Sequence, residues 1–122
     1  MIELDQMKQK LMTYEEPLTE VKASLDLDSK QKRIEELEME MEAPGFWDNP
    51  DYSNKRMKEL KNLKDTVQLI EGLCTQKDDI FTLIEMGYEE NDESLIPEIQ
   101  GELDSFINLG RHAYQHPFVR RI

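Results

Sequence analysis

Seven apolar residues near the start of the chain recur at alternating intervals of three and four. An α-helix makes one turn in 3.6 residues, so this spacing places all seven on one stripe, as in a coiled-coil seam. Pro17 interrupts the stripe, because proline lacks an N–H and clashes with the preceding turn, and we expect a kink or break near residues 13–16. The stripe resumes beyond it, which predicts that both halves pack on the same partner. Its members are Leu4, Met7, Leu11, Tyr14, Leu18, Val21 and Leu25.

Two further helices are predicted by the same periodicity. One runs from about residue 30 to residue 42, after the N-cap candidates Asp26, Asp28 and Ser29. It stops at Ala43-Pro44-Gly45, and the ordered connector that follows contains Phe46 and Trp47. The next helix spans about residues 53–86. The apolar stripes are Ile34, Leu37 and Met41 in the first helix, and Leu60, Leu63, Val67, Ile70, Cys74, Phe81 and Ile84 in the second.

A fourth helix follows an acidic turn at residues 89–93. Asp92 or Ser94 can cap it, Pro97 is tolerated in its first turn, and Gly110 ends it. Residues 111–122 show no period, and we expect an irregular tail. The apolar face of this helix consists of Ile96, Ile99, Leu103, Phe106 and Ile107.

Together these patterns predict an all-α fold of three to four antiparallel helices, a coiled-coil-like helical bundle. The 122 residues suit one domain, which we assign to residues 1–110, followed by the basic tail at 111–122. We expect the stripe at 4–25 to pack on the stripe at 60–84, because both repeat at intervals of three and four.

The net charge of −12 limits the kinds of partner. All 27 acidic residues precede residue 105, whereas residues 111–122 contain three arginines, two histidines and no acid. A body this acidic is repelled by phosphate backbones, so we expect no direct binding to DNA. Basic proteins remain suitable partners.

The expected location is the cytoplasm. Cys74 is the single cysteine, so no intrachain disulfide can form, which fits a reducing compartment. No apolar run approaches the roughly 18 residues of a membrane-spanning helix. The first residues lack the basic and then apolar regions of a signal peptide.

No group of residues predicts an active site. His112 and His116 have the spacing of a metal-binding pair on a helix, but Pro117 follows and no carboxylate is near in sequence. Cys74 occupies a stripe position, which favours an inert buried side chain over a nucleophile. The glutamates at 35, 36, 38, 40 and 42 suit a solvated helix face, and there is no glycine-rich phosphate loop. We therefore assign no catalytic, cofactor-binding or metal-binding residue and expect no enzymatic activity.

Two apolar features leave a choice between packing and binding. Met39, Met41, Met57 and Met86 are interpreted as core filling, with a methionine-rich binding groove as the alternative. Trp47 is interpreted as a buried packing anchor, with an exposed contact as the alternative.

The stretch Ser24–Leu37 resembles the start of the bacterial peptide chain release factor 2 family. The stretch Pro44–Pro50 resembles it too, because the family has a Pro-x-(aromatic or aliphatic)-Trp-(Asp/Asn) pattern there. The likeness covers about residues 1–104. Residues 111–122 depart from the pattern, which leaves their native status open.

The resemblance implies a role in translation termination. In that family a Gly-Gly-Gln loop promotes peptidyl-tRNA hydrolysis and a Ser-Pro-Phe motif reads UGA and UAA stop codons; neither motif occurs here. The implied role is that of the N-terminal helical domain, which reaches toward the GTPase-associated region of the ribosome and helps to position the factor. Because the chain is acidic, we expect the contact there to be a basic ribosomal protein. The heptads alone also suit a stand-alone coiled-coil adaptor or dimerisation module, and an isolated domain of this kind could form a homodimer.

Overall fold

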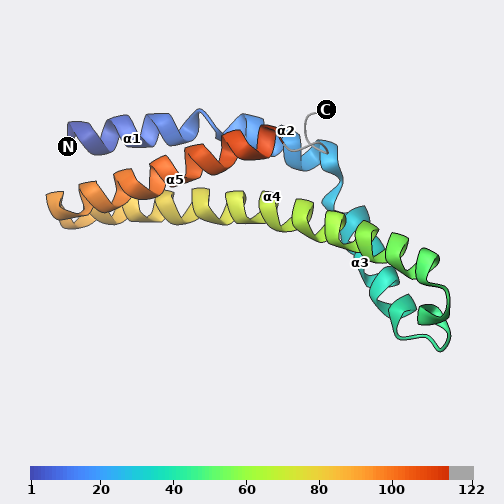
Figure 1. The fold of residues 1–122 in the computed structure, drawn as a ribbon. Helices are drawn as coiled ribbons and strands as arrows, with labels where there is room; N and C mark the ends of the chain where they lie inside the picture. Colours follow the sequence, from blue (N-terminus) through green and yellow to red (C-terminus); the bar gives the residue numbers. More distant parts are fainter. Residues whose placement is uncertain (116–122) are drawn as a thin grey trace.

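The computed structural model describes residues 1–115 and contains only helices and their connections in that range. The α-helices and two short 3₁₀ helices form a bundle in which α4 runs antiparallel to the helices beside it, which confirms the predicted all-α bundle (Figure 1). The elements are α1 (Ile2–Met12), α2 (Glu15–Leu25), α3 (Leu27–Met41), η1 (Phe46–Asp48), α4 (Pro50–Glu90), η2 (Glu93–Leu95) and α5 (Ile96–Gln115). No helix among the residues described is long and apolar enough to span a membrane.

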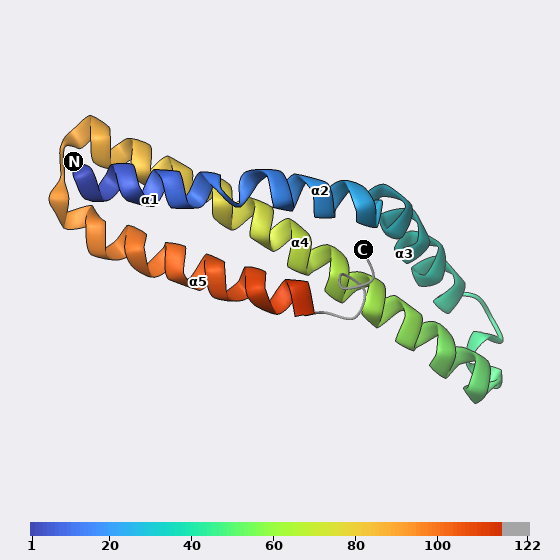
Figure 2. The same ribbon diagram turned by 90° about the horizontal axis from the view of Figure 1, so that it is seen from above.

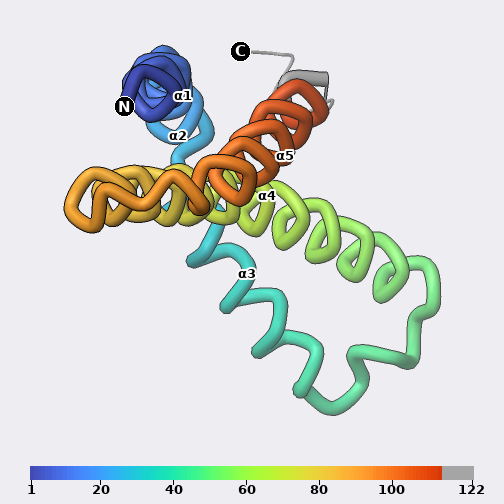
Figure 3. The backbone as a smooth tube through the Cα atoms, turned by 90° about the vertical axis from the view of Figure 1, so that its left-hand side faces the viewer, coloured from blue at the N-terminus to red at the C-terminus, as the bar shows by residue number. Residues whose placement is uncertain are grey.

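The long helix α4 is the backbone of the fold. Its 41 residues correspond to about 60 Å, and the other helices pack along it. The later half of α4 lies beside α1, α2 and α5, whereas the earlier half pairs with α3 as a hairpin. Figures 1 and 3 show α3 on the opposite side of α4 from α1 and α5.

The break predicted at Pro17 is present. Helix α1 ends at Met12, and α2 begins at Glu15, so Pro17 lies in the first turn of α2, where its missing N–H is tolerated. The two helices follow each other along nearly one line (Figure 2). All members of the first stripe are buried except Tyr14, which is half-buried, and their neighbours belong to α4 and α5.

The predicted stripe of α4 needs correction at two places. Leu60 and Val67 pack against Ile34 and Leu37 of α3, so the first stripe meets only the later part of α4. In that part Phe81 is 41% exposed, and the fully buried residue is Ile80. Adjacent side chains on a helix point about 100° apart, and at this position Ile80, not Phe81, points into the main core together with the predicted Ile84.

The end of the last helix was also predicted wrongly. Helix α5 passes through Gly110 and continues to Gln115, so residues 111–115 are helical and not irregular. Glycine costs only about 1 kcal/mol relative to alanine inside a helix, which the packing of the buried Ala113 offsets. The expectation of an irregular tail at 116–122 lies outside the residues described.

Side-chain caps fix three of the junctions between helices. Asp26 has a left-handed backbone with φ 48°, and its carboxylate accepts hydrogen bonds from the backbone N–H and the hydroxyl of Ser29. These bonds hold the pKa of Asp26 below its usual range. Asn49 caps α4 by accepting from the N–H of Tyr52, and Asp92 caps η2 by accepting from that of Ser94.

Candidate functional surface

Among residues 1–115, the side chains considered for catalysis or metal binding form no common site. His112 is exposed on the last turns of α5, while its proposed partner His116 lies outside the residues described. Within residues 1–115 no cluster of three potential metal ligands is formed. Cys74 is half-buried and packs against the main core.

The prediction that the four methionines fill the core is wrong for three of them. Met39 is 73% exposed, and Met57 and Met86 are also exposed, whereas Met41 is half-buried against the α3–α4 core. They are spread over α3 and both ends of α4, so nothing here shows them lining one groove.

The hairpin formed by α3 and α4 ends in a well-defined turn. Helix α3 stops at Met41, and Gly45 takes a left-handed backbone with φ 86° that reverses the chain. The 3₁₀ helix η1 follows at once, and Pro50 opens α4 at a position where its missing N–H is harmless. This turn lies at the far end of the hairpin, away from α1 and α5 (Figure 1).

Three aromatic residues meet at this turn, and we call Phe46, Trp47 and Tyr52 the aromatic tip. The ring of Phe46 is buried and contacts Trp47 edge to face, with ring centroids 4.8 Å apart. Tyr52 packs on the same ring at 6.0 Å. Trp47 is 53% exposed and Tyr52 is 42% exposed, so the interpretation of Trp47 as a buried anchor is wrong.

The reason is local geometry. Two adjacent residues in a short helical turn point in directions about a third of a turn apart, so Phe46 and Trp47 cannot both face one thin core. Phe46 takes the inner position. The adjacency of the two aromatics was the signal in the sequence that one of them would be exposed.

Polar contacts hold Tyr52 in place. Its hydroxyl donates a hydrogen bond to the carboxylate of Glu40 on α3, which raises the pKa of Tyr52. The guanidinium of Arg56 lies over the Tyr52 ring, with its central carbon 5.2 Å from the ring centroid. The aromatic tip is therefore tied to both helices of the hairpin.

An arginine–glutamate network supports the hairpin below the tip. Arg33 of α3 contacts Glu59 of α4 with both ends of its guanidinium, Nε to Oε2 at 2.8 Å and NH2 to Oε1 at 3.2 Å. Arg56 adds a third contact to Glu59 at 2.9 Å. The hydrogen bonds from Arg33 lower the pKa of Glu59, so this carboxylate stays ionised.

The stretch of chain that carries most of the aromatic tip is strongly acidic. From residue 34 to residue 54 the chain has seven carboxylates and no lysine or arginine. Among the residues described, only Glu36 and Glu38 of these seven form ion pairs, with Arg33 and Lys64. The remaining five are Glu35, Glu40, Glu42, Asp48 and Asp51.

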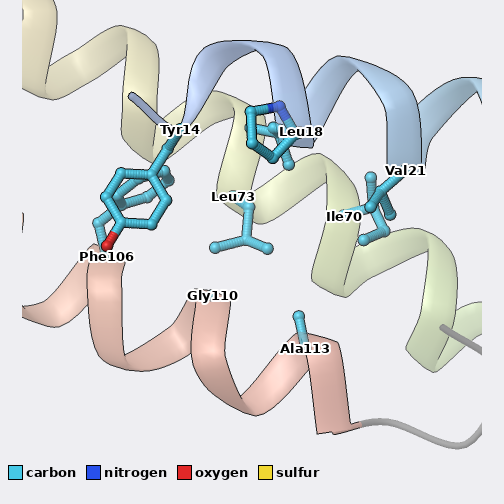
Figure 4. A pocket seen from close by; sticks show the side chains of 9 residues that line it. Tyr14, Leu18, Val21, Ile70, Leu73, Phe106, Gly110 and Ala113 are labelled. Atoms are coloured by element: carbon cyan, nitrogen blue, oxygen red, sulfur yellow. The ribbon is translucent and has the colours of Figure 1, made fainter. Parts of the chain in front are cut away.

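A small cavity lies between α2, α4 and α5 (Figure 4). Its volume is about 30 Å³, and its surface is apolar. Such a space has no polar group to orient a substrate, so we attach no binding role to it. The residues around it are Tyr14, Pro17, Leu18, Val21, Ile70, Leu73, Phe106, Gly110 and Ala113.

Comparison with known proteins gives a consistent result. The PCRF domain family matches residues 30–115, a range that includes the hairpin and α5. Peptide chain release factor 2 of Clostridium perfringens is 37% identical over 102 residues, which cover 84% of this chain and 28% of that protein. The corresponding protein of Yersinia enterocolitica is 31% identical over 104 residues, with 85% and 28% covered.

The similarity also reaches the end of the chain. Peptide chain release factor 2 of Haemophilus ducreyi is 31% identical over 119 residues, 97% of this chain and 33% of that protein, so most of residues 111–122 fall within the alignment. The chain spans about a third or less of the length of the relatives described.

Proposed function

Because this chain belongs to the PCRF domain family, we propose that it is the N-terminal helical domain of a translation termination factor and acts as a ribosome-contacting and positioning module. The observation that supports the proposal is the match of the family to residues 30–115 together with release factor 2 relatives over 84–97% of the chain. Such a module works in the cytoplasm, where ribosomes translate.

The charge of the molecule supports a protein partner on the ribosome. The net charge of −12 and the seven carboxylates between residues 34 and 54 repel ribosomal RNA and attract basic proteins. From the resemblance to release factors, we propose that this partner lies near the GTPase-associated region. Stop-codon-directed peptide release is proposed for the full-length factor and not for this chain.

The structure weakens the adaptor alternative. The apolar stripe of α1 and α2, which an adaptor would use to pair with another chain, is covered by α4 and α5 of the same chain. An unpaired seam is therefore not available among these residues. We propose that the chain is a monomer, and sedimentation at micromolar concentration tests this.

Two measurements test the proposed function. In a release assay on stop-programmed ribosomes, the chain alone should release no peptide, because binding energy without a reacting group accelerates nothing. In a competition assay, excess chain should slow release by a full-length factor weakly, and less so at high salt because the attraction is screened. Release by the chain alone would contradict the non-catalytic role, and no competition at low salt would contradict ribosome contact.

A further inference from the structure

We infer that the aromatic tip is a docking surface for an arginine-rich segment of a partner protein. The inference deepens the proposed function and rests on it, because it names the part of the domain that makes the ribosome contact. It starts from the exposure of Trp47 and Tyr52, two residues that are 53% and 42% exposed at the end of a projecting hairpin. Clustered exposed aromatics at such a site are typical of interaction surfaces.

The tip is held in a fixed shape before any partner binds. Phe46 is buried and contacts Trp47, and the Tyr52 hydroxyl donates a hydrogen bond to Glu40. Asn49, which lies between Trp47 and Tyr52 in the sequence, caps the start of α4. A rigid aromatic side chain loses little conformational freedom on binding, and a surface that is already ordered binds more tightly. The exposed methionines differ from the tip, because their side chains are flexible.

The charges around the tip select the chemistry of the partner. Five carboxylates between residues 34 and 54 have no ion-pair partner among the residues described. Of the basic residues that flank this stretch, Arg33 and Arg56 are already paired with Glu59. Exposed aromatic rings within a field of negative charge favour a cation, since a guanidinium can stack on the ring and also bond to a carboxylate. Phosphate groups of RNA would be repelled.

The chain already uses this interaction once. The Arg56 guanidinium lies over the Tyr52 ring at 5.2 Å, and the Glu40 carboxylate accepts from the hydroxyl of the same residue. In residues 1–115 the cations placed over aromatic rings lie on Tyr52, Phe81 and Tyr88, and none lies on Trp47. Trp47 is thus an exposed aromatic residue in an acidic stretch, and its ring is left open to a cation from a partner.

The first test uses the 122-residue chain and purified ribosomes. A fluorescently labelled chain should lose about tenfold or more in affinity on Trp47→Ala, as expected for a tryptophan anchor. The control is Phe81→Ala, since Phe81 is an exposed aromatic on α4 already covered by Lys8 of the same chain, and its affinity should stay within about twofold. The double variant Glu42→Gln, Asp51→Asn should weaken binding and reduce its salt dependence.

The second test needs no ribosome. Trp47 is the only tryptophan, so its emission reports contact at the tip directly. Nona-arginine should change this emission at lower concentration than nona-lysine, because the guanidinium stacks on aromatic faces, and nona-glutamate should have no effect. Binding elsewhere on the acidic surface would leave the emission unchanged.

The outcomes separate this inference from the proposed function. Equal ribosome binding by the wild type and Trp47→Ala, with unchanged helicity, overturns the inference and leaves the proposed function standing. Failure of the wild type to bind ribosomes contradicts the proposed function. If nona-arginine also leaves the Trp47 emission unchanged, the docking surface is contradicted as well. If nona-arginine changes the emission, the docking surface is retained for another basic partner. Equal binding to protein-free ribosomal RNA overturns the choice of a protein partner.

Discussion

Gly87 of α4 lies so close to Leu4 of α1 that a Cβ atom at position 87 would be 2.9 Å from the Leu4 Cδ1 atom. Leu4 is completely buried, so its side chain cannot easily move away. Gly87 therefore permits the close approach of α1 to the end of α4. The same contact region includes the hydrogen bond from the Tyr88 hydroxyl to Asp5 and the ion pair between Lys8 and Glu85.

We expect Gly87→Ala to destabilise the fold, while Gly72→Ala stabilises it. Alanine is better than glycine by about 1 kcal/mol inside a helix, and a Cβ at Gly72 meets nothing within 4 Å. At Gly87 this gain is opposed by overpacking against Leu4, which costs about 1–3 kcal/mol. Urea unfolding of the two variants measures the difference, and a stabilised Gly87→Ala would show that Leu4 moves freely.

The two adjacent aromatics of the tip should differ sharply in their contribution to stability. Phe46→Ala removes a buried ring and should cost about 3 kcal/mol. Trp47→Ala should cost no more than about 1 kcal/mol, because its main contact is the edge-to-face pair with Phe46. Thermal melts of both variants provide the measurement, and a larger loss for Trp47→Ala would restore its role as an anchor.

Local patterns in the sequence predicted most of the helical fold. The intervals of three and four placed the first stripe in the core, Pro17 marked the break between α1 and α2, and Pro97 was expected in the first turn of α5. These features depend on residues a few positions apart. They could be read without knowing which helices meet.

The errors arose where neighbours from distant parts of the chain decide the outcome. Phe81 and Ile80 both suit a helix face, and only the positions of α1 and α5 determine that Ile80 is buried. The periodicity of α4 also does not indicate that its earlier apolar residues pack on α3 while its later ones pack on the other helices. The adjacency of Phe46 and Trp47 indicates that one of them is exposed, but which one depends on how η1 turns.

The hairpin should lose a specific contribution to stability at low pH. The hydrogen bonds of Arg33 lower the pKa of Glu59 in the folded state, so their contribution is complete above the ordinary carboxyl pKa of about 4.3 and is lost as the pH falls through the lower folded value. Glu59→Gln lacks this contribution. At pH 7 it should be less stable by about 1 kcal/mol or less, because the side chains are partly exposed and screened.

The measurement is the difference in unfolding free energy between the wild type and Glu59→Gln from pH 7 to pH 3. This difference should be constant down to about pH 5 and then shrink. Glu98→Gln is the matched control, since Glu98 is exposed on α5 and forms no ion pair among the residues described. A difference that grows toward low pH would have the wrong sign for this network.

The two hydrophobic clusters should open separately. Leu37 belongs to the cluster of the α3–α4 hairpin, whereas Leu103 belongs to the cluster formed by α1, α2, α4 and α5, and both are buried almost completely. Leu37→Ala and Leu103→Ala should each cost about 2–5 kcal/mol, because each leaves a cavity. Regions with their own core can unfold locally below the global free energy.

Hydrogen exchange should show where each loss falls. In Leu37→Ala, amides of α3 and of the first part of α4, up to about Val67, should exchange faster while those of α1 and α5 keep their protection. In Leu103→Ala the pattern should reverse, because the second cluster includes Leu4 and Phe106 but no buried residue of α3. Equal loss of protection throughout both variants would mean that α4 couples the clusters into one cooperative unit, and the hairpin would then not present the aromatic tip independently of the rest.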